Sequence, residues 1–182
     1  MSTSRNAPYH HGDLRRALLD AALLILRDEG EAGLGLRELA RAVGVSPAAP
    51  YRHFDGRVAL LEALAVTGWT RFTAAMEATA AGRPQDRRIA MGRTYVRFAL
   101  DNANLFRLMF SPQLRRDNRP GLRMAADAAY GTLRYIAGGH RLDSIAAWSL
   151  VHGLAVLLLD GQIRLGPDED VDALVDAVLG RG

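Results

Sequence analysis

Apolar residues recur three or four positions apart along most of the chain, and this periodicity constrains the fold more than any other feature. Alternating β-branched segments, which are typical of strands, are nearly absent. Gly and Pro fall mostly between the periodic segments, where they end helices and form turns. The sequence therefore predicts an all-α protein, with one or two small domains in its 182 residues.

The periodicity predicts nine helices, separated by short breaks. Their expected ranges are 13–29, 36–43, 47–54, 56–79, 86–102, 104–110, 122–137, 144–165 and 170–179. The clearest break is Ala81-Gly82-Arg83-Pro84, where we place a domain boundary. The expected domains are residues 12–72 and 84–180, and the helix 56–79 should join them.

Composition excludes several classes of protein. The chain has no Cys and no Lys, so all 23 basic residues are Arg. Thiolate zinc sites, cysteine nucleophiles, Schiff-base lysines and the Walker A lysine are therefore excluded. No targeting signal is visible at the start, and the apolar stretch Ile145–Leu159 looks too short and too polar to span a membrane. A soluble cytoplasmic protein without a membrane partner is the expectation.

No residues are grouped as enzymes or metal sites require. Ser149 and His152 are three apart on one expected helix, but no acid on that helix is placed to orient the imidazole. His10 and His11 are adjacent and project in different directions, which argues against a metal pair. We therefore expect no catalytic residue, no metal and no cofactor.

The segment Leu36–Phe54, LRELARAVGVSPAAPYRHF, has the pattern of a helix-turn-helix. Gly44 permits a tight turn after the first helix, and Val45 supplies an apolar peg beneath both helices. Ser46 followed by Pro47 is a typical start for the second helix, with backbone N–H groups left to approach a phosphate. A purely structural α-hairpin is the alternative, and the polar triplet at residues 51–53 disfavours it.

Residues 12–72 closely resemble the DNA-binding domain of TetR-family transcriptional regulators. The resemblance rests on Gly30, Leu34, Leu36-Arg37-Glu38-Leu39-Ala40, Gly44-Val45-Ser46, Tyr51-Arg52-His53-Phe54, Arg57 and Ala59-Leu60-Leu61. It implies a three-helix DNA-binding head and a helical core that dimerises and holds a ligand pocket.

The resemblance also implies roles for residues in and near the motif, which spans about 35–54. Tyr51, His53 and Arg57 occupy positions that commonly contact phosphate, while Ala48, Ala49 and Arg52 usually face bases. The full expected DNA-binding set is Arg37, Ser46, Ala48, Ala49, Tyr51, Arg52, His53 and Arg57.

Two departures from the family pattern affect the head. Gly35 lies where Thr or Ser often caps the second helix, and it offers no hydroxyl to a phosphate. Pro50 lies inside the short recognition helix, where we expect it to cost little hydrogen bonding. Pro50 and the weak positive charge of the head leave an alternative open, a small-molecule binding protein whose head has lost DNA binding.

The order Trp148-x-x-x-His152-Gly153 resembles the motif of the WHG type of TetR C-terminal domain. Trp148 and His152 share a helix face, and Gly153 is expected to allow close helix approach. We expect a mostly apolar effector to lie against Phe98, Phe106, Met109, Phe110, Trp148 and His152. The alternatives are a packed aromatic core and a buried His152 bonded to a neighbouring polar group.

The resulting hypothesis is a ligand-responsive regulator, most often a repressor by the resemblance. It would read a pseudo-palindromic operator in double-stranded DNA as a homodimer. The last two expected helices carry more apolar surface than one chain end needs, so they are the expected dimer interface.

Overall fold

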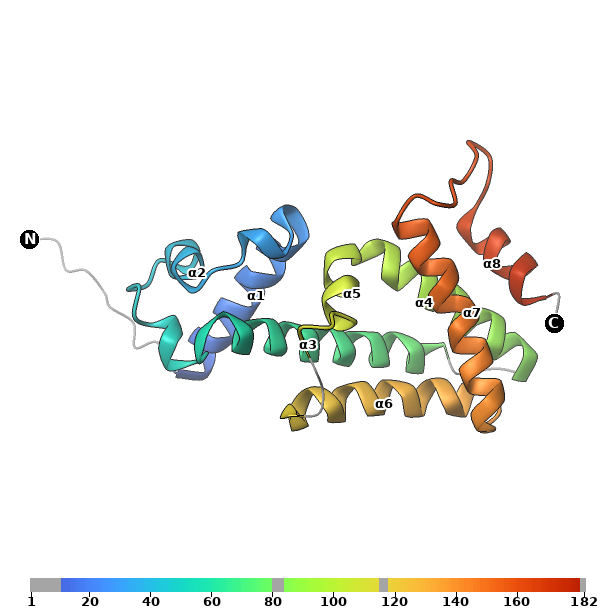
Figure 1. Ribbon diagram of the computed structural model, residues 1–182, viewed down its shortest axis with the longest axis horizontal. Coiled ribbons are helices and arrows are strands. Elements are labelled where there is room, and N and C mark those ends of the chain that lie inside the picture. Colours follow the sequence, from blue (N-terminus) through green and yellow to red (C-terminus); the bar gives the residue numbers. More distant parts are fainter. Residues whose placement is uncertain (1–10, 80–83, 115–117, 181–182) are drawn as a thin grey trace, which may run out of the picture. The chain divides into compact units, whose positions relative to one another are not determined.

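The computed structural model describes residues 11–79, 84–114 and 118–180, and the regular elements in these ranges are all helices. The all-α prediction is therefore confirmed (Figure 1). Contacts divide the chain into two compact units, Met1–Leu64 and Ala65–Gly182. This division falls inside a helix and not at the expected break, of which residues 81–83 lie outside the described ranges.

The first unit contains α1 (His11–Glu29), a 3-10 turn η1 (Glu31–Gly33), α2 (Leu36–Val43), a second 3-10 turn η2 (Pro50–Arg52) and the start of α3 (Gly56–Ala78). Three α1 side chains spaced four apart, Leu18, Ala22 and Leu26, are buried. They share the core with Leu34, Leu36, Leu39, Phe54, Leu60 and Leu61. The predicted α1 stripe thus forms the support for the helix-turn-helix segment.

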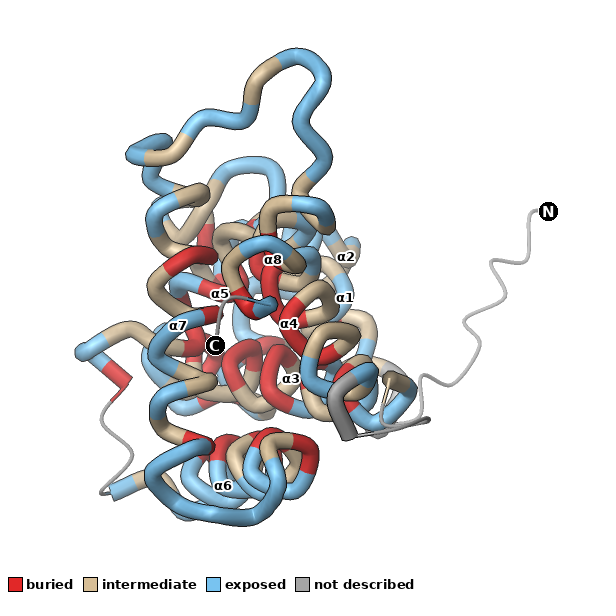
Figure 2. Tube along the Cα trace, turned by 90° about the vertical axis from the view of Figure 1, so that its right-hand side faces the viewer, coloured by how far each residue is buried: buried red, intermediate tan, exposed pale blue. Residues whose placement is uncertain are grey.

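The second unit contains the rest of α3, α4 (Pro84–Asp101), α5 (Ala103–Met109), α6 (Pro120–Ile136), α7 (Arg141–Leu159) and α8 (Val171–Leu179). Helix α4 contacts α5, α6, α7 and α8, so it is the central element of this unit. Its buried residues include Met91, Tyr95 and Ala99, which are spaced four apart on one face. Figure 2 shows these buried stretches on α4 and α3.

Helix α8 packs against α4 through small and charged residues. A Cβ built on Gly92 of α4 would lie 2.2 Å from a Leu179 methyl, so glycine permits this close approach. Arg93 pairs with Asp176, and Arg97 Nε lies 2.6 Å from Asp172 Oδ1. The Arg93 guanidinium holds the pKa of the Asp176 carboxyl below its usual value.

The bounds of the α-helices lie within three residues of the expected ranges except at the end of α7, and the expected helix 47–54 is described with the site below. Helix α6 starts at Pro120, because proline suits the first helical position, and so part of the expected loop 112–121 is helical. Helix α7 ends at Leu159, six residues before the expected end, where Gly161 adopts a positive φ of 66°. The segment that follows is largely exposed, as Figure 2 shows.

By length and composition, α7 could cross a membrane, with a mean hydropathy of 1.8 over an 18-residue window. We expected the stretch Ile145–Leu159 to be too short and too polar to span a membrane. That expectation was wrong for the complete 19-residue helix. A core helix of a protein outside the membrane meets the same criterion, yet only 22% of this window is buried within the chain. Much of the apolar surface of α7 is left without cover from its own chain.

Candidate functional site

The turn after α2 has the geometry that the sequence predicts. Gly44 adopts a left-handed conformation with φ 74° and ψ 32°. Its N–H donates to the Arg41 carbonyl over 3.2 Å, and the Val45 N–H donates to the Ala40 carbonyl over 2.9 Å. These two bonds form a Schellman motif, which closes the helix and reverses the chain toward residues 46–54.

The segment 47–54 is not the α-helix that we expected. Residues 47–49 form a turn and Pro50–Arg52 a 3-10 helix, with Ala49 N–H bonded to the Ser46 carbonyl over 2.9 Å. An α-helix would require the amide of Pro50 to reach that carbonyl, but proline has no N–H. The chain therefore tightens to i→i+3 bonds up to His53, while the Phe54 N–H reaches the Pro50 carbonyl over 3.0 Å in the i→i+4 pattern, so Pro50 costs one bond of the expected helix.

The polar side chains of this recognition segment, residues 46–54, point largely to solvent. Tyr51 is 54% exposed, Arg52 is exposed and His53 is half-buried. Phe54 is 2% exposed and lies under the Arg15 guanidinium, whose Cζ is 5.4 Å from the ring centroid. Phe54 thus anchors the segment, as expected, together with the buried Pro50.

The remaining expected DNA-binding residues lie on the same unit. Arg37, Ser46 and Ala48 are exposed, and Ala49 is half-buried. Gly35 is the N-cap of α2 in an extended conformation, without a side-chain cap. This agrees with its expected role as a cap that offers no hydroxyl.

Arg57 makes contacts that the sequence did not indicate. Its Nε donates to the Leu34 carbonyl over 3.0 Å, and its Nη2 donates to the Glu31 carbonyl and to Glu31 Oε1 over 2.8 and 3.0 Å. The guanidinium therefore ties α3 to the turn that precedes α2. A guanidinium has five N–H groups, so the two on Nη1 are left for another acceptor.

The second unit holds a connected aromatic and polar cluster. The Trp148 Nε1–H donates to the Tyr95 hydroxyl over 3.0 Å, and that hydroxyl lies 2.9 Å from His152 Nδ1. Burial raises the pKa of Tyr95 and lowers the pKa of His152, so both groups are neutral at neutral pH. His152 is half-buried and bonded to a polar neighbour, which is the contact that the alternative to ligand binding expects.

Four other residues expected at the ligand pocket pack beside this cluster. The ring centroids of Phe106 and Phe110 are 5.6 and 4.5 Å from that of His152. Phe98 packs on Phe72 at 5.2 Å, and Met109 is 3% exposed. These contacts resemble a packed core more than the wall of a cavity.

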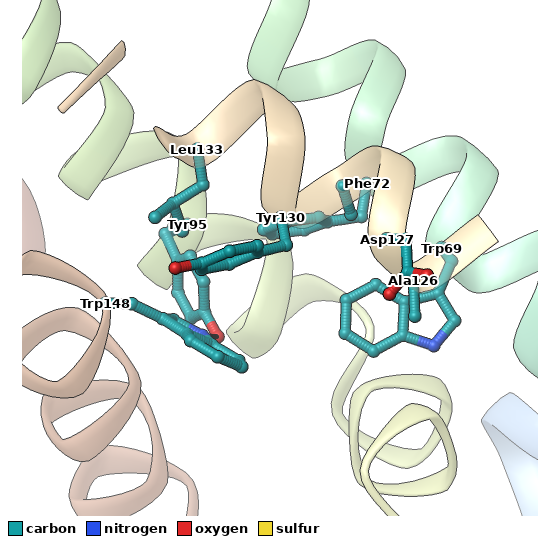
Figure 3. Close-up of a pocket in the computed structure, with 9 residues that line it drawn as sticks. Trp69, Phe72, Tyr95, Ala126, Asp127, Tyr130, Leu133 and Trp148 are labelled. Atoms are coloured by element: carbon teal, nitrogen blue, oxygen red, sulfur yellow. Dashed lines mark hydrogen bonds between the residues drawn. The ribbon is translucent and has the colours of Figure 1, made fainter. Parts of the chain in front are cut away.

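A cavity of about 220 Å³ lies nearby among α3, α4, α6 and α7 (Figure 3). Its lining consists of Trp69, Phe72, Tyr95, Ala126, Asp127, Ala129, Tyr130, Leu133 and Trp148. Of the six residues expected to contact ligand, only Trp148 is among them. The sequence signal that we missed is the i, i+3, i+4, i+7 spacing of Ala126, Ala129, Tyr130 and Leu133, which puts one face of α6 on the cavity.

Gly153 does not have the packing role that we expected within the chain. A Cβ built at this position would meet no atom within 4 Å, so no helix of the same chain approaches it closely.

Within the described residues, no group of three or more His, Cys, Asp and Glu side chains could hold a metal ion.

Comparisons with known proteins agree with this arrangement. Residues 18–64 match the profile of bacterial regulatory proteins of the tetR family, and residues 89–181 match that of the tetracyclin repressor-like C-terminal domain. The chain belongs to the TetR family of transcriptional regulators. The first matched stretch lies in the helix-turn-helix head, and the second is the C-terminal domain of this family.

Individual relatives support the TetR assignment over different lengths. The HTH-type transcriptional regulator BetI of Rhizobium meliloti is 36% identical over 85 residues, which cover 46% of this chain and 42% of BetI. A solved protein of unknown function from Rhodococcus sp. RHA1 is 34% identical, with a TM-score of 0.83 over 97% of this chain and 96% of that one.

One structural neighbour was solved with both a small molecule and operator DNA bound. AibR, solved in complex with isovaleryl coenzyme A and operator DNA, is 18% identical, with a TM-score of 0.66 over 92% of this chain and 97% of that one. At this identity, the likeness shows a shared fold.

Proposed function

We propose that this TetR-family protein is a homodimeric repressor that reads a pseudo-palindromic operator and responds to a small effector. The observation that carries the proposal is the recognition segment, which a Schellman turn directs away from α2 and which buried Phe54 anchors. Tyr51 and Arg52 are thereby presented to solvent from a short, fixed backbone. Such a protein would act in the cytoplasm, where it meets DNA.

Each expected DNA-binding residue of the head has a proposed contact with DNA. Tyr51 and His53 would bind phosphates, which position a protein on the duplex, and Arg57 would add a phosphate contact through Nη1. Ala48, Ala49 and Arg52 would face base edges in the major groove, where a methyl can touch thymine and a guanidinium can pair with guanine. Arg37 and Ser46 flank the turn and would contact the backbone.

The proposed dimer interface is the uncovered face of α7, together with α8. Ala146, Leu150, Gly153 and Leu157 follow a spacing of four, three and four, so they form one stripe. Leu150 and Leu157 are 44% and 43% exposed, and the open space beside Gly153 would admit a partner helix. Leu154 of α7 and Val175 of α8 are buried within the chain and unavailable to a partner.

The proposed effector site is the cavity beside Trp148. AibR binds isovaleryl coenzyme A on the same fold, which supports a ligand within this domain. An effector that binds one spacing of the two heads better than the other would shift the population toward it, and so change operator affinity.

A second function, ligand binding without DNA binding, has one observation in its favour. Pro50 replaces the recognition α-helix by a turn and a 3-10 helix. The two functions are separated by selecting fragments from a random DNA library with the purified protein. Enrichment of one pseudo-palindrome supports the repressor, whereas a library that stays random after repeated selection contradicts it.

A further inference from the structure

The cavity of the second unit has a wall of five aromatic rings and one charged residue, and that residue is acidic. Trp69 and Phe72 come from α3, Tyr95 from α4, Tyr130 from α6 and Trp148 from α7. The Tyr130 and Trp148 ring centroids are 5.7 Å apart, and those of Phe72 and Tyr95 are 5.1 Å apart. The rings thus line the cavity from four helices.

Asp127 stands at the edge of this wall, on α6. It is exposed, and in Figure 3 it lies toward the Trp69 end of the cavity, away from Trp148. Among the residues that the structure describes, no Arg lines the cavity and none forms an ion pair with Asp127. The carboxylate is therefore available to a charge that enters the cavity.

These two features favour one class of ligand. The face of an aromatic ring carries negative potential and attracts a cation, and Trp is the strongest of the three ring types. A carboxylate at the rim adds attraction for the same charge and repels an acyl carboxylate or a phosphate. A cavity of about 220 Å³ limits the ligand to a small organic molecule.

We propose that the effector is a small organic cation, with a quaternary or tertiary ammonium group held among the rings and opposed by Asp127. The inference rests on the proposed function only in calling this ligand the effector, because binding itself requires no DNA. Trp148 would report occupancy to the rest of the domain, since its Nε1–H is bonded to Tyr95, which is bonded to His152.

Calorimetry with three matched compounds tests the charge preference. The cation is 4-(trimethylammonio)benzyl alcohol, its neutral carbon isostere is 4-tert-butylbenzyl alcohol, and the anion is 4-tert-butylbenzoate. We expect the cation to bind about tenfold more tightly than the isostere, and the anion most weakly. Equal affinities, tighter binding of the anion, or no binding of any compound would overturn the proposal.

Asp127→Asn removes the charge with little change of shape. We expect it to weaken the cation about tenfold and to leave the neutral isostere unchanged, which also shows that the cavity is intact. Asp168→Asn, the same change at an exposed residue outside the cavity, should leave the affinities of all three compounds unchanged. An unchanged affinity of Asp127→Asn for the cation would overturn the role of Asp127. Operator binding is measured separately, so failure of the repressor proposal is distinguishable from failure of this one.

Discussion

The hydroxyl of Tyr95 lies 2.9 Å from Nδ1 of His152 and joins the central helix of the second unit to α7. The Trp148 Nε1–H donates to the same oxygen, so this hydroxyl bonds two side chains of α7. Trp148 and His152, which the sequence placed on one helix face, are thus linked through Tyr95, which the sequence did not place beside them.

Removing the Tyr95 hydroxyl should destabilise the protein. Tyr95→Phe keeps the buried ring but leaves Trp148 Nε1 and His152 Nδ1 without this partner. We expect a loss of about 1–3 kcal/mol in the free energy of unfolding, measured by urea denaturation. Tyr135→Phe, at a ring that is 68% exposed, is the matched control and should change it little. A Tyr95→Phe protein as stable as the wild type would contradict the account of this network.

Protonation of His152 should destabilise the folded chain. Its pKa is lowered by burial from 6.5, so the unfolded chain takes up this proton first as pH falls. The contribution to stability is fully present above pH 6.5 and is lost between 6.5 and the lower pKa of the folded state. Urea denaturation between about pH 5 and 8 should show a steeper fall for the wild type than for His152→Gln, in which an amide replaces the titrating ring. Identical pH profiles would show that His152 does not titrate in this way.

Arg57 should have two separable functions. Arg57→Lys keeps the charge but loses the planar fork that bonds Leu34 and Glu31, so we expect it to lose about 1 kcal/mol of stability and keep the salt dependence of operator binding. Arg57→Ala should lose both, and the slope of log affinity against log salt should fall by about one unit. Arg71→Ala, at an exposed residue of α3, is the control for stability. An Arg57→Ala slope equal to that of the wild type would restrict Arg57 to a structural role.

The uncovered face of α7 should hold two chains together. Leu157→Arg places a charge in the proposed seam and should convert a dimer into a monomer in sedimentation velocity at micromolar concentration. Met124→Arg, at a residue 71% exposed on α6, is the matched control and should remain dimeric. A wild-type protein that sediments as a monomer and still binds its operator would refute the dimer.

The sequence predicted the helices well and the contacts between distant helices poorly. Helical spacing and the Gly44 turn are local features, so α1, α2 and the Schellman motif could be read from neighbouring residues. The Arg57 bonds to the turn before α2 span 23 and 26 residues, and no local pattern indicates them.

The candidate cavity shows the same difference between local and long-range information. Trp148 and His152 were expected to face one ligand because they share a helix face. Of these two residues, Trp148 lines the cavity in the structure, whereas His152 does not and is bonded to Tyr95 on another helix. The 3-10 geometry at Pro50 could have been predicted from the sequence, because the missing N–H of proline is a local property. We underestimated its effect on the type of helix.

The central claim is that two copies of this chain read two half-sites of one operator. The most direct measurement is a fluorescence-anisotropy titration of a fragment selected from the random library, at fixed salt, beside a fragment with one half-site scrambled. The account predicts saturation at two protomers per intact fragment, with at least about a hundredfold weaker binding to the scrambled fragment. Equal affinity for the intact fragment, the scrambled fragment and random DNA would contradict it.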